Sequence, residues 1–236
     1  MQSTQERKKS KLAKALLPSF TAELRRYDDI YQVFCKAGYS KELCEMYASA
    51  MVGDLKKPDP YDIIETAKLY DKIHDISTAY FYIDKLSDKK LSGDDKYEYC
   101  IEMLKLLSKK GKWRDAVDFR TENINFLQNY SAKLPLQRQA DLYIALALVD
   151  CAAKKYDQAF RMLMGFGYKP QGKNDTTLLE ILITGVYICA CSGDSEGLSD
   201  AMDNAHECLK IFKELPFEWS REYYENCIEE ASERII

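Results

Sequence analysis

A pattern of paired amphipathic helices repeats along most of the chain, and this repeat constrains the fold more than any other feature. In residues 60–86, apolar residues at helical spacing lead to a polar turn at His74 and Asp75, and a second apolar face follows that turn. The small residue Ala79 lies where the two predicted helices cross. Four other segments share the pattern, and the crossing residues are separated by 36, 37, 43 and 39 positions: Leu43, Ala79, Ala116, Ala159 and Leu198. The repeat therefore predicts five antiparallel helix pairs.

Glycines mark three of the predicted turns. Gly38, Gly111 and Gly193 each follow a first helix, at the position where a left-handed backbone conformation ends a helix without strain. The five predicted pairs cover residues 24–52, 60–86, 97–127, 138–166 and 177–209, separated by breaks at 55–60, 87–96 and 168–174. None of the breaks is long enough for a flexible linker between domains. A last amphipathic helix over residues 217–234 is predicted to cap the stack.

These residues resemble the tetratricopeptide repeat (TPR) family. The matching positions are Ala67, Tyr70, Ile76, Ala79, Ile83 and Leu86, then Leu104, Leu107, Gly111, Trp113 and Ala116, then Ala147, Tyr156 and Ala159. The spacing exceeds the family's repeat of roughly 34 residues, and Arg120 and Asp150 occupy steps that are usually apolar. The resemblance covers about residues 24–210. It implies an all-α, right-handed α-solenoid of about five antiparallel helix pairs with a C-terminal capping helix, in which a basic segment (1–20) precedes a single repeat domain (21–236).

Composition agrees with a helical protein. Ten Gly and six Pro in 236 residues are few for an all-β fold, which needs many tight turns. No uncharged apolar run reaches the roughly 18 residues needed to cross a bilayer, so no membrane span is predicted. The eight cysteines are dispersed and form no C-x-x-C motif, which favours free thiols in the reducing cytoplasm. Cys189 and Cys191 are interpreted as buried helix residues, and neither a metal site nor a cofactor is predicted.

Charge is distributed unevenly along the chain. The net charge is −4, but residues 1–26 hold seven basic and two acidic side chains and so carry +5, which leaves −9 on the remainder. The acidic body argues against broad electrostatic binding of nucleic acid. The basic head supports an alternative hypothesis, in which a regulatory protein contacts RNA or DNA through residues 7–26.

One pentapeptide, residues 193–197, matches the G-x-S-x-G motif that carries the nucleophile of many serine hydrolases. That chemistry also needs a histidine base and a sheet to hold the turn. The chain has only His74 and His206, and no strand pattern is evident. A turn between helices, with Gly193 as the C-cap and Ser195 as the N-cap, explains the motif more simply. The hydrolase stays a remote alternative, and the chain is predicted not to be an enzyme.

The resemblance also implies a binding site, because in TPR proteins the first helix of each pair lines a groove that holds a partner peptide. The corresponding residues of this chain are Lys68, Lys72, Lys105, Lys109, Leu148 and Tyr187, with Cys191 at a further such step. Each lysine pair lies one helical turn apart, so four ammonium groups are expected in one groove. They are suited to an acidic segment or a C-terminal carboxylate of a protein or peptide partner. The predicted function is therefore a protein–protein interaction module or scaffold.

Overall fold

The structure is a computed structural model that describes residues 34, 38–53, 58–170, 175–212 and 218–235. All regular elements in these residues are α-helices, which confirms the predicted all-α class for this part of the chain. The basic segment 1–20 and nearly all of the first helix of the first predicted pair lie outside the described residues. The helices are α3 (Lys41–Met51), α4 (Pro60–Lys72), α5 (Ile76–Asp84), α6 (Gly93–Lys109), α7 (Trp113–Ser131), α8 (Leu136–Ala152), α9 (Tyr156–Gly165), α10 (Thr177–Ser192), α11 (Ser195–Ile211) and α12 (Glu218–Ser232).

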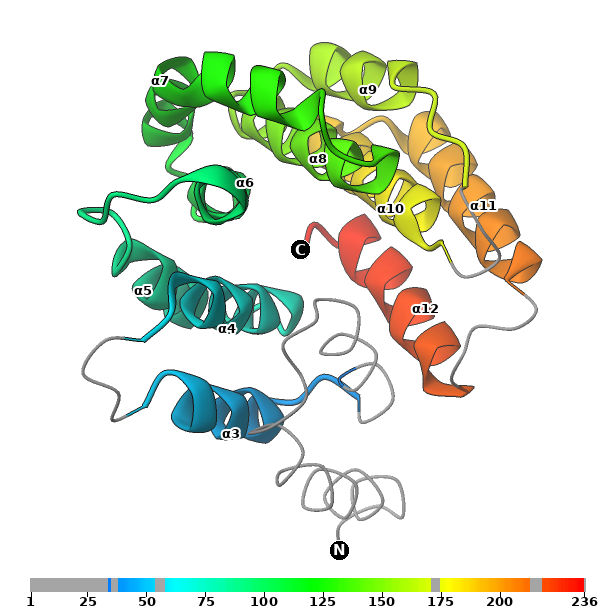
Figure 1. Ribbon diagram of the computed structural model, residues 1–236. Helices are drawn as coiled ribbons and strands as arrows, with labels where there is room; N and C mark the ends of the chain where they lie inside the picture. The colour runs from blue at the N-terminus through cyan, green and yellow to red at the C-terminus, as the bar shows by residue number, and fades with distance from the viewer. Residues whose placement is uncertain (1–33, 35–37, 54–57, 171–174, 213–217, 236) are drawn as a thin grey trace, which may run out of the picture.

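The helices pack in consecutive pairs, α4 with α5, α6 with α7, α8 with α9 and α10 with α11. The first helix of each pair also packs against the first helix of the next, so α4, α6, α8 and α10 form one continuous layer. Together the pairs form an arch, with α6, α8 and α10 on its inner side and α7, α9 and α11 on its outer side (Figure 1). The inner layer is therefore the surface that successive pairs share.

The turns between paired helices have the same backbone conformation throughout. A positive φ occurs at Gly38 (72°), His74 (58°), Gly111 (70°), Lys154 (61°) and Gly193 (77°). These positions are separated by 36, 37, 43 and 39 residues, as the crossing residues are. The left-handed conformation predicted at the three glycines is confirmed. Two pairs make the same turn without glycine, at some cost in backbone strain.

Small residues allow the paired helices to approach closely. Ala79, Ala116 and Ala159, the crossing residues of three pairs, are fully buried, and Leu43 is nearly so. Leu198, the crossing residue of the last pair, is only partly buried. The crossing positions predicted from the sequence are therefore fully buried in three of the four pairs that the structure describes completely.

Three local predictions were wrong. Helix α6 begins at Gly93, inside the predicted break at 87–96, where Gly93 adopts a φ of 59°. Helix α8 begins at Leu136 rather than 138, directly after Pro135, whose fixed φ suits the start of a helix. Helix α11 is capped by Asp194 rather than Ser195, because the Asp194 carboxylate accepts the backbone N–H of Gly197 at 3.0 Å.

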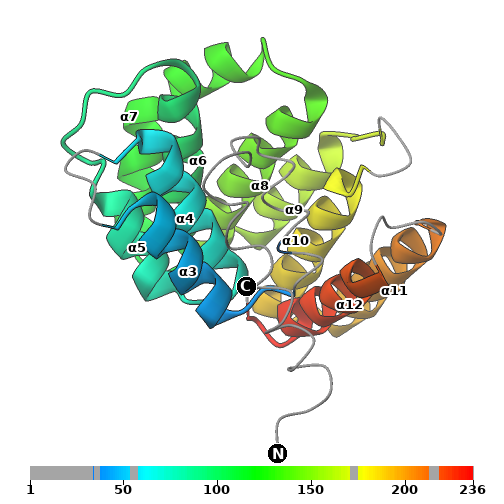
Figure 2. The same ribbon diagram turned by 60° about the horizontal axis from the view of Figure 1, so that its bottom comes forward.

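The two ends of the arch meet through α12. Helix α12 packs against α10 and α11, and in Figure 2 it runs alongside α11. From α12, Glu230 reaches the α4–α5 turn, where its carboxylate lies 2.8 Å from Nε2 of His74. The Tyr223 ring lies 4.8 Å from the ring of Tyr39, just before α3. The last helix therefore contacts both the last pair and the first described ones.

Candidate functional site

The inner layer of helices carries a dense group of charged residues, called here the inner ion cluster. Its members come from α4, α6 and α8 and include both signs of charge. They are Glu65, Lys68, Asp71, Glu98, Glu102, Lys105, Lys109, Arg138 and Asp141. Several of them are buried, which is unusual for charged side chains and marks this face as a candidate binding site.

Lys68 joins α4 to α6. Its Nζ donates to Oε1 of Glu65 at 3.0 Å and to Oε2 of Glu98 at 2.6 Å. Glu98 also accepts a hydrogen bond from Arg138 on α8, so one carboxylate joins three successive first helices. Burial alone would raise the pKa of Glu98, but the charges of Lys68 and Arg138 outweigh it and lower that pKa to about 2.

Asp71 and Lys109 form a second link between α4 and α6. The Lys109 ammonium donates to both carboxylate oxygens of Asp71, at 2.7 and 2.6 Å. Although burial acts in the opposite direction, the Lys109 ammonium holds the pKa of Asp71 below its usual value. Lys72, one residue further, lies 3.7 Å from Glu180 on α10 and so bridges the inner side of the arch.

Glu102 is the least compensated member of the cluster. Its side chain is almost entirely buried, with a residue exposure of 1%, and its Oε1 has no hydrogen-bond partner among the described residues. Burial, followed by the charge of Asp71, raises the pKa of Glu102 to about 7 even though Lys105, Lys109 and Lys68 oppose the shift. Burial likewise raises the pKa of Asp141 on α8, to about 6. The cluster thus contains carboxylates that its own cations do not fully satisfy.

The structure brings together the four lysines predicted from the sequence. The positive charges of Lys68, Lys105 and Lys109 all favour the ionised form of Glu102. Those of Lys72, Lys105 and Lys109 lower the pKa of Asp71. Three of the four already contact carboxylates of the same chain, while Lys105 has no ion pair within 4 Å among the described residues.

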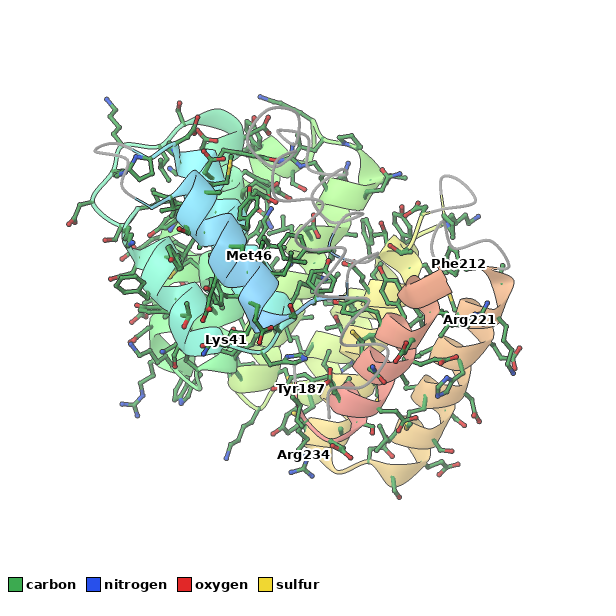
Figure 3. All side chains as sticks on the ribbon, turned by 90° about the horizontal axis from the view of Figure 1, so that it is seen from below. Lys41, Met46, Tyr187, Phe212, Arg221 and Arg234 are labelled. Carbon is green, nitrogen blue, oxygen red and sulfur yellow. The ribbon has the colours of Figure 1, made fainter. Side chains whose placement is uncertain are left out.

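The two predicted uncharged residues lie away from the ion cluster. Leu148 is 4% exposed and belongs to the hydrophobic core between α8, α9 and α10. Tyr187 is partly exposed on α10 and packs with Cys191 against the hydrophobic core between α8, α9 and α10. Figure 3 labels Tyr187 and Arg234, which follows the end of α12.

Sequence reasoning missed the carboxylates that accompany these lysines. A signal for them was present, because Glu98, Glu102, Lys105 and Lys109 follow one another at steps of four, three and four and so share a helix face. The buried position of Glu102 depends on packing between α4, α6 and α8, which the pattern within one helix does not reveal.

The residues of the hydrolase alternative lie apart. Ser195 is exposed at the first position of α11. His74 contacts Glu230 at 2.8 Å, and His206 lies 3.8 Å from Glu229, so each histidine contacts a carboxylate of α12 rather than Ser195.

Pockets occur outside the inner ion cluster. One of about 240 Å³ is lined by residues of α3, α4 and α5 that include Ser49, Tyr70 and Tyr82, and another of about 310 Å³ lies at the α8–α9 turn around Lys155 and Arg161. In the described ranges, no three His, Cys, Asp or Glu side chains are grouped as metal ligands, and no helix has the length and apolar character to span a membrane. Comparison with protein-family models, curated proteins and solved structures found no match.

Proposed function

We propose that this protein is an interaction module, a right-handed solenoid of TPR-like helix pairs that binds a segment of a partner protein along its inner layer of helices. We further propose that the partner segment supplies a cationic side chain, Lys or Arg, to the inner ion cluster. This assignment reverses the sign of charge expected from the four lysines alone, since three of them already contact internal carboxylates.

The observation that carries the proposal is Glu102. Burial of a carboxylate without a full set of hydrogen-bond donors costs free energy and gives nothing to folding. Glu102 nevertheless lies at the centre of the inner layer with Oε1 unpaired among the described residues. A donor from a partner would complete this group, and a cationic donor would also offset the mutual repulsion of Glu102 and Asp71.

The ion pairs that bridge the inner side of the arch among the described residues are weak. Lys72 and Glu180, which bridge α4 and α10, have side chains about one-third exposed, at 30% and 34%. His74 and Glu230, which join α4 to α12, are similarly exposed, at 29% and 40%. Exposed ion pairs contribute about 0–1 kcal/mol each, so a partner segment could displace them at little cost.

Fluorescence anisotropy with two labelled amphipathic helical peptides tests this assignment. One peptide carries Lys and Arg on its polar face, and the other has Glu at the same positions. We expect the basic peptide to bind the full-length protein and Glu102→Gln to weaken that binding at least tenfold, which corresponds to about 1.4 kcal/mol. The matched control is Glu122→Gln, at an exposed position of α7 on the outer side of the arch.

Three results would contradict the proposal in different ways. If Glu102→Gln and Glu122→Gln changed the affinity for the basic peptide equally, Glu102 would not be part of the binding site. If only the acidic peptide bound, and Lys105→Glu abolished that binding, the partner would carry the acidic segment that the lysines predicted. Binding of neither peptide would contradict recognition of an amphipathic helical segment by charge.

A further inference from the structure

Cys151 and Cys191 lie in the last turns of two successive first helices, α8 and α10. Helices α8 and α10 pack against each other, both cysteine side chains belong to the hydrophobic cluster between α8, α9 and α10, and each thiol acts on the pKa of the other. Cys151 lies three positions before the left-handed turn residue Lys154, and Cys191 lies two positions before Gly193. Two thiols separated by 40 residues are therefore adjacent in space.

The same register recurs earlier in the arch. Asp71 lies three positions before His74, Lys109 lies two positions before Gly111, and their charged groups approach to 2.6 Å. The cysteines thus occupy a position where side chains of neighbouring first helices meet.

The surroundings of Cys191 favour its thiolate. The hydrogen bond from Cys151, followed by one from Tyr187 and by the positive charge of Arg234, lowers the pKa of Cys191 to about 6 against the effect of burial. Burial raises the pKa of Cys44 and Cys100 to about 12 and that of Cys227 to about 11. Cys191 is partly exposed, whereas Cys151 is 4% exposed, so an oxidant from solvent reaches Cys191 first.

We propose that Cys191 and Cys151 form a peroxide-reactive dithiol, in which Cys191 is the attacking thiol and Cys151 the resolving thiol. The Cys191 thiolate attacks one oxygen of a hydroperoxide, the O–O bond breaks, and Cys191 becomes a sulfenic acid while hydroxide or alkoxide leaves. The Cys151 sulfur then attacks the Cys191 sulfur, the S–O bond breaks, and the oxygen leaves as water. For hydrogen peroxide, two thiols and one peroxide give one disulfide and two molecules of water.

The disulfide would alter the end of the arch as well as join α8 to α10. Formation of the bond removes the thiolate that faces Arg234 beyond α12. The redox state of this pair would therefore act on Tyr187 of α10 and on Arg234, which follows α12.

The test uses the full-length protein, reduced and then treated with hydrogen peroxide at pH 7. We expect the intact mass to fall by two hydrogen atoms, and peptide mapping without reductant to show a link between Cys151 and Cys191. Cys191 should be consumed at least about tenfold faster than the buried cysteines, because the thiolate is the reactive form. A link between any other pair, or oxidation without a link, would overturn the proposal, and this readout on the unmodified protein needs no variant.

Variants separate the two roles. Cys151→Ser should leave a sulfenic acid at Cys191 that dimedone labels, and Cys191→Ser should abolish both the label and the link. Cys189→Ser is the matched control, because Cys189 is a buried cysteine of the same helix and its pKa is raised by burial. Loss of the Cys151–Cys191 link in the Cys189 variant, with helical content unchanged by circular dichroism, would contradict the assignment.

Discussion

Lys154 and Gly111 occupy equivalent turns and share a left-handed backbone conformation, with φ of 61° and 70°. A residue with a Cβ is strained there by roughly 1–2 kcal/mol, whereas the greater freedom of glycine in the unfolded chain offsets part of that difference. We therefore expect Lys154→Gly to raise the free energy of unfolding by about 0.5 kcal/mol. Urea denaturation followed by circular dichroism measures this change.

The converse substitution is its control. Nothing lies within 4 Å of a Cβ built on Gly111, so Gly111→Ala creates strain without a steric clash. We expect that substitution to lower the free energy of unfolding by about 1 kcal/mol. If both substitutions shifted stability in the same direction, the two turns would not be equivalent.

Arg120 and Asp150, the two departures from the TPR pattern, form an ion pair. The Arg120 guanidinium donates to Asp150 at 2.6 Å between α7 and α8, and Asp150 is 1% exposed. Removal of one partner leaves a buried charge unpaired, so Asp150→Leu and Arg120→Leu should each lower the free energy of unfolding by about 3 kcal/mol. The double substitution of both residues by Leu should cost less than about 1.5 kcal/mol, since it restores two apolar positions.

A double-mutant cycle from chemical denaturation measures the coupling between these residues. We expect the double variant to be clearly more stable than the sum of the single effects. Additive losses would mean that Arg120 and Asp150 act independently and that the ion pair contributes little.

The sequence was informative wherever the repeat fixes the structure locally. The crossing residues, the left-handed glycines and the helix order follow from periodicity and helix-capping chemistry. The left-handed His74 and Lys154 could have been predicted only by alignment of the five turns, because neither is a glycine, which adopts that conformation without strain. In the sequence, Arg120 and Asp150 were two unconnected charged residues at positions that are usually apolar in the TPR pattern. Only the packing of α7 on α8 shows that they form an ion pair.

The candidate site could be predicted only in part. The lysines were identified through the resemblance, but their charge balance was not, since Lys68 and Lys109 pair with carboxylates 30 and 38 residues away on a neighbouring helix and Lys72 pairs with Glu180 on α10. The thiol pair was missed for the same reason. Attention to Cys189 and Cys191, two positions apart, concealed Cys151, which lies at the corresponding place in the preceding pair.

Stability should depend on pH through Glu102. Its pKa is raised from 4.5 to about 7, so between those values the folded protein binds a proton that the unfolded chain does not bind. The contribution of Glu102 therefore makes the protein more stable as pH falls from about 7 towards 4.5. Glu98 acts with the opposite sign: its lowered pKa contributes stability above 4.5, which is lost as pH falls towards about 2.

Glu102→Gln isolates the first effect. We expect the variant to lose the part of the rise in stability between pH 7 and 5 that Glu102 contributes, while Asp141, whose pKa is raised to about 6, keeps its own part, when denaturation midpoints are measured across this range. Glu122→Gln should behave as the unmodified protein. An unchanged pH profile in Glu102→Gln would show that Glu102 titrates near its ordinary pKa in the folded state.

Helix α12 makes two kinds of contact, and substitutions can weigh them separately. Ile228 is fully buried with Leu179 and Val186 of α10 in one hydrophobic cluster, so Ile228→Ala should lower the free energy of unfolding by about 2–4 kcal/mol. Glu230 meets His74 in a partly exposed pair, so Glu230→Gln should cost less than about 1 kcal/mol. Thermal or urea denaturation compares the two. A loss of similar size in both variants would mean that α12 is held as firmly to α4 as to α10, and that the ends of the arch do not open as readily as the binding proposal requires.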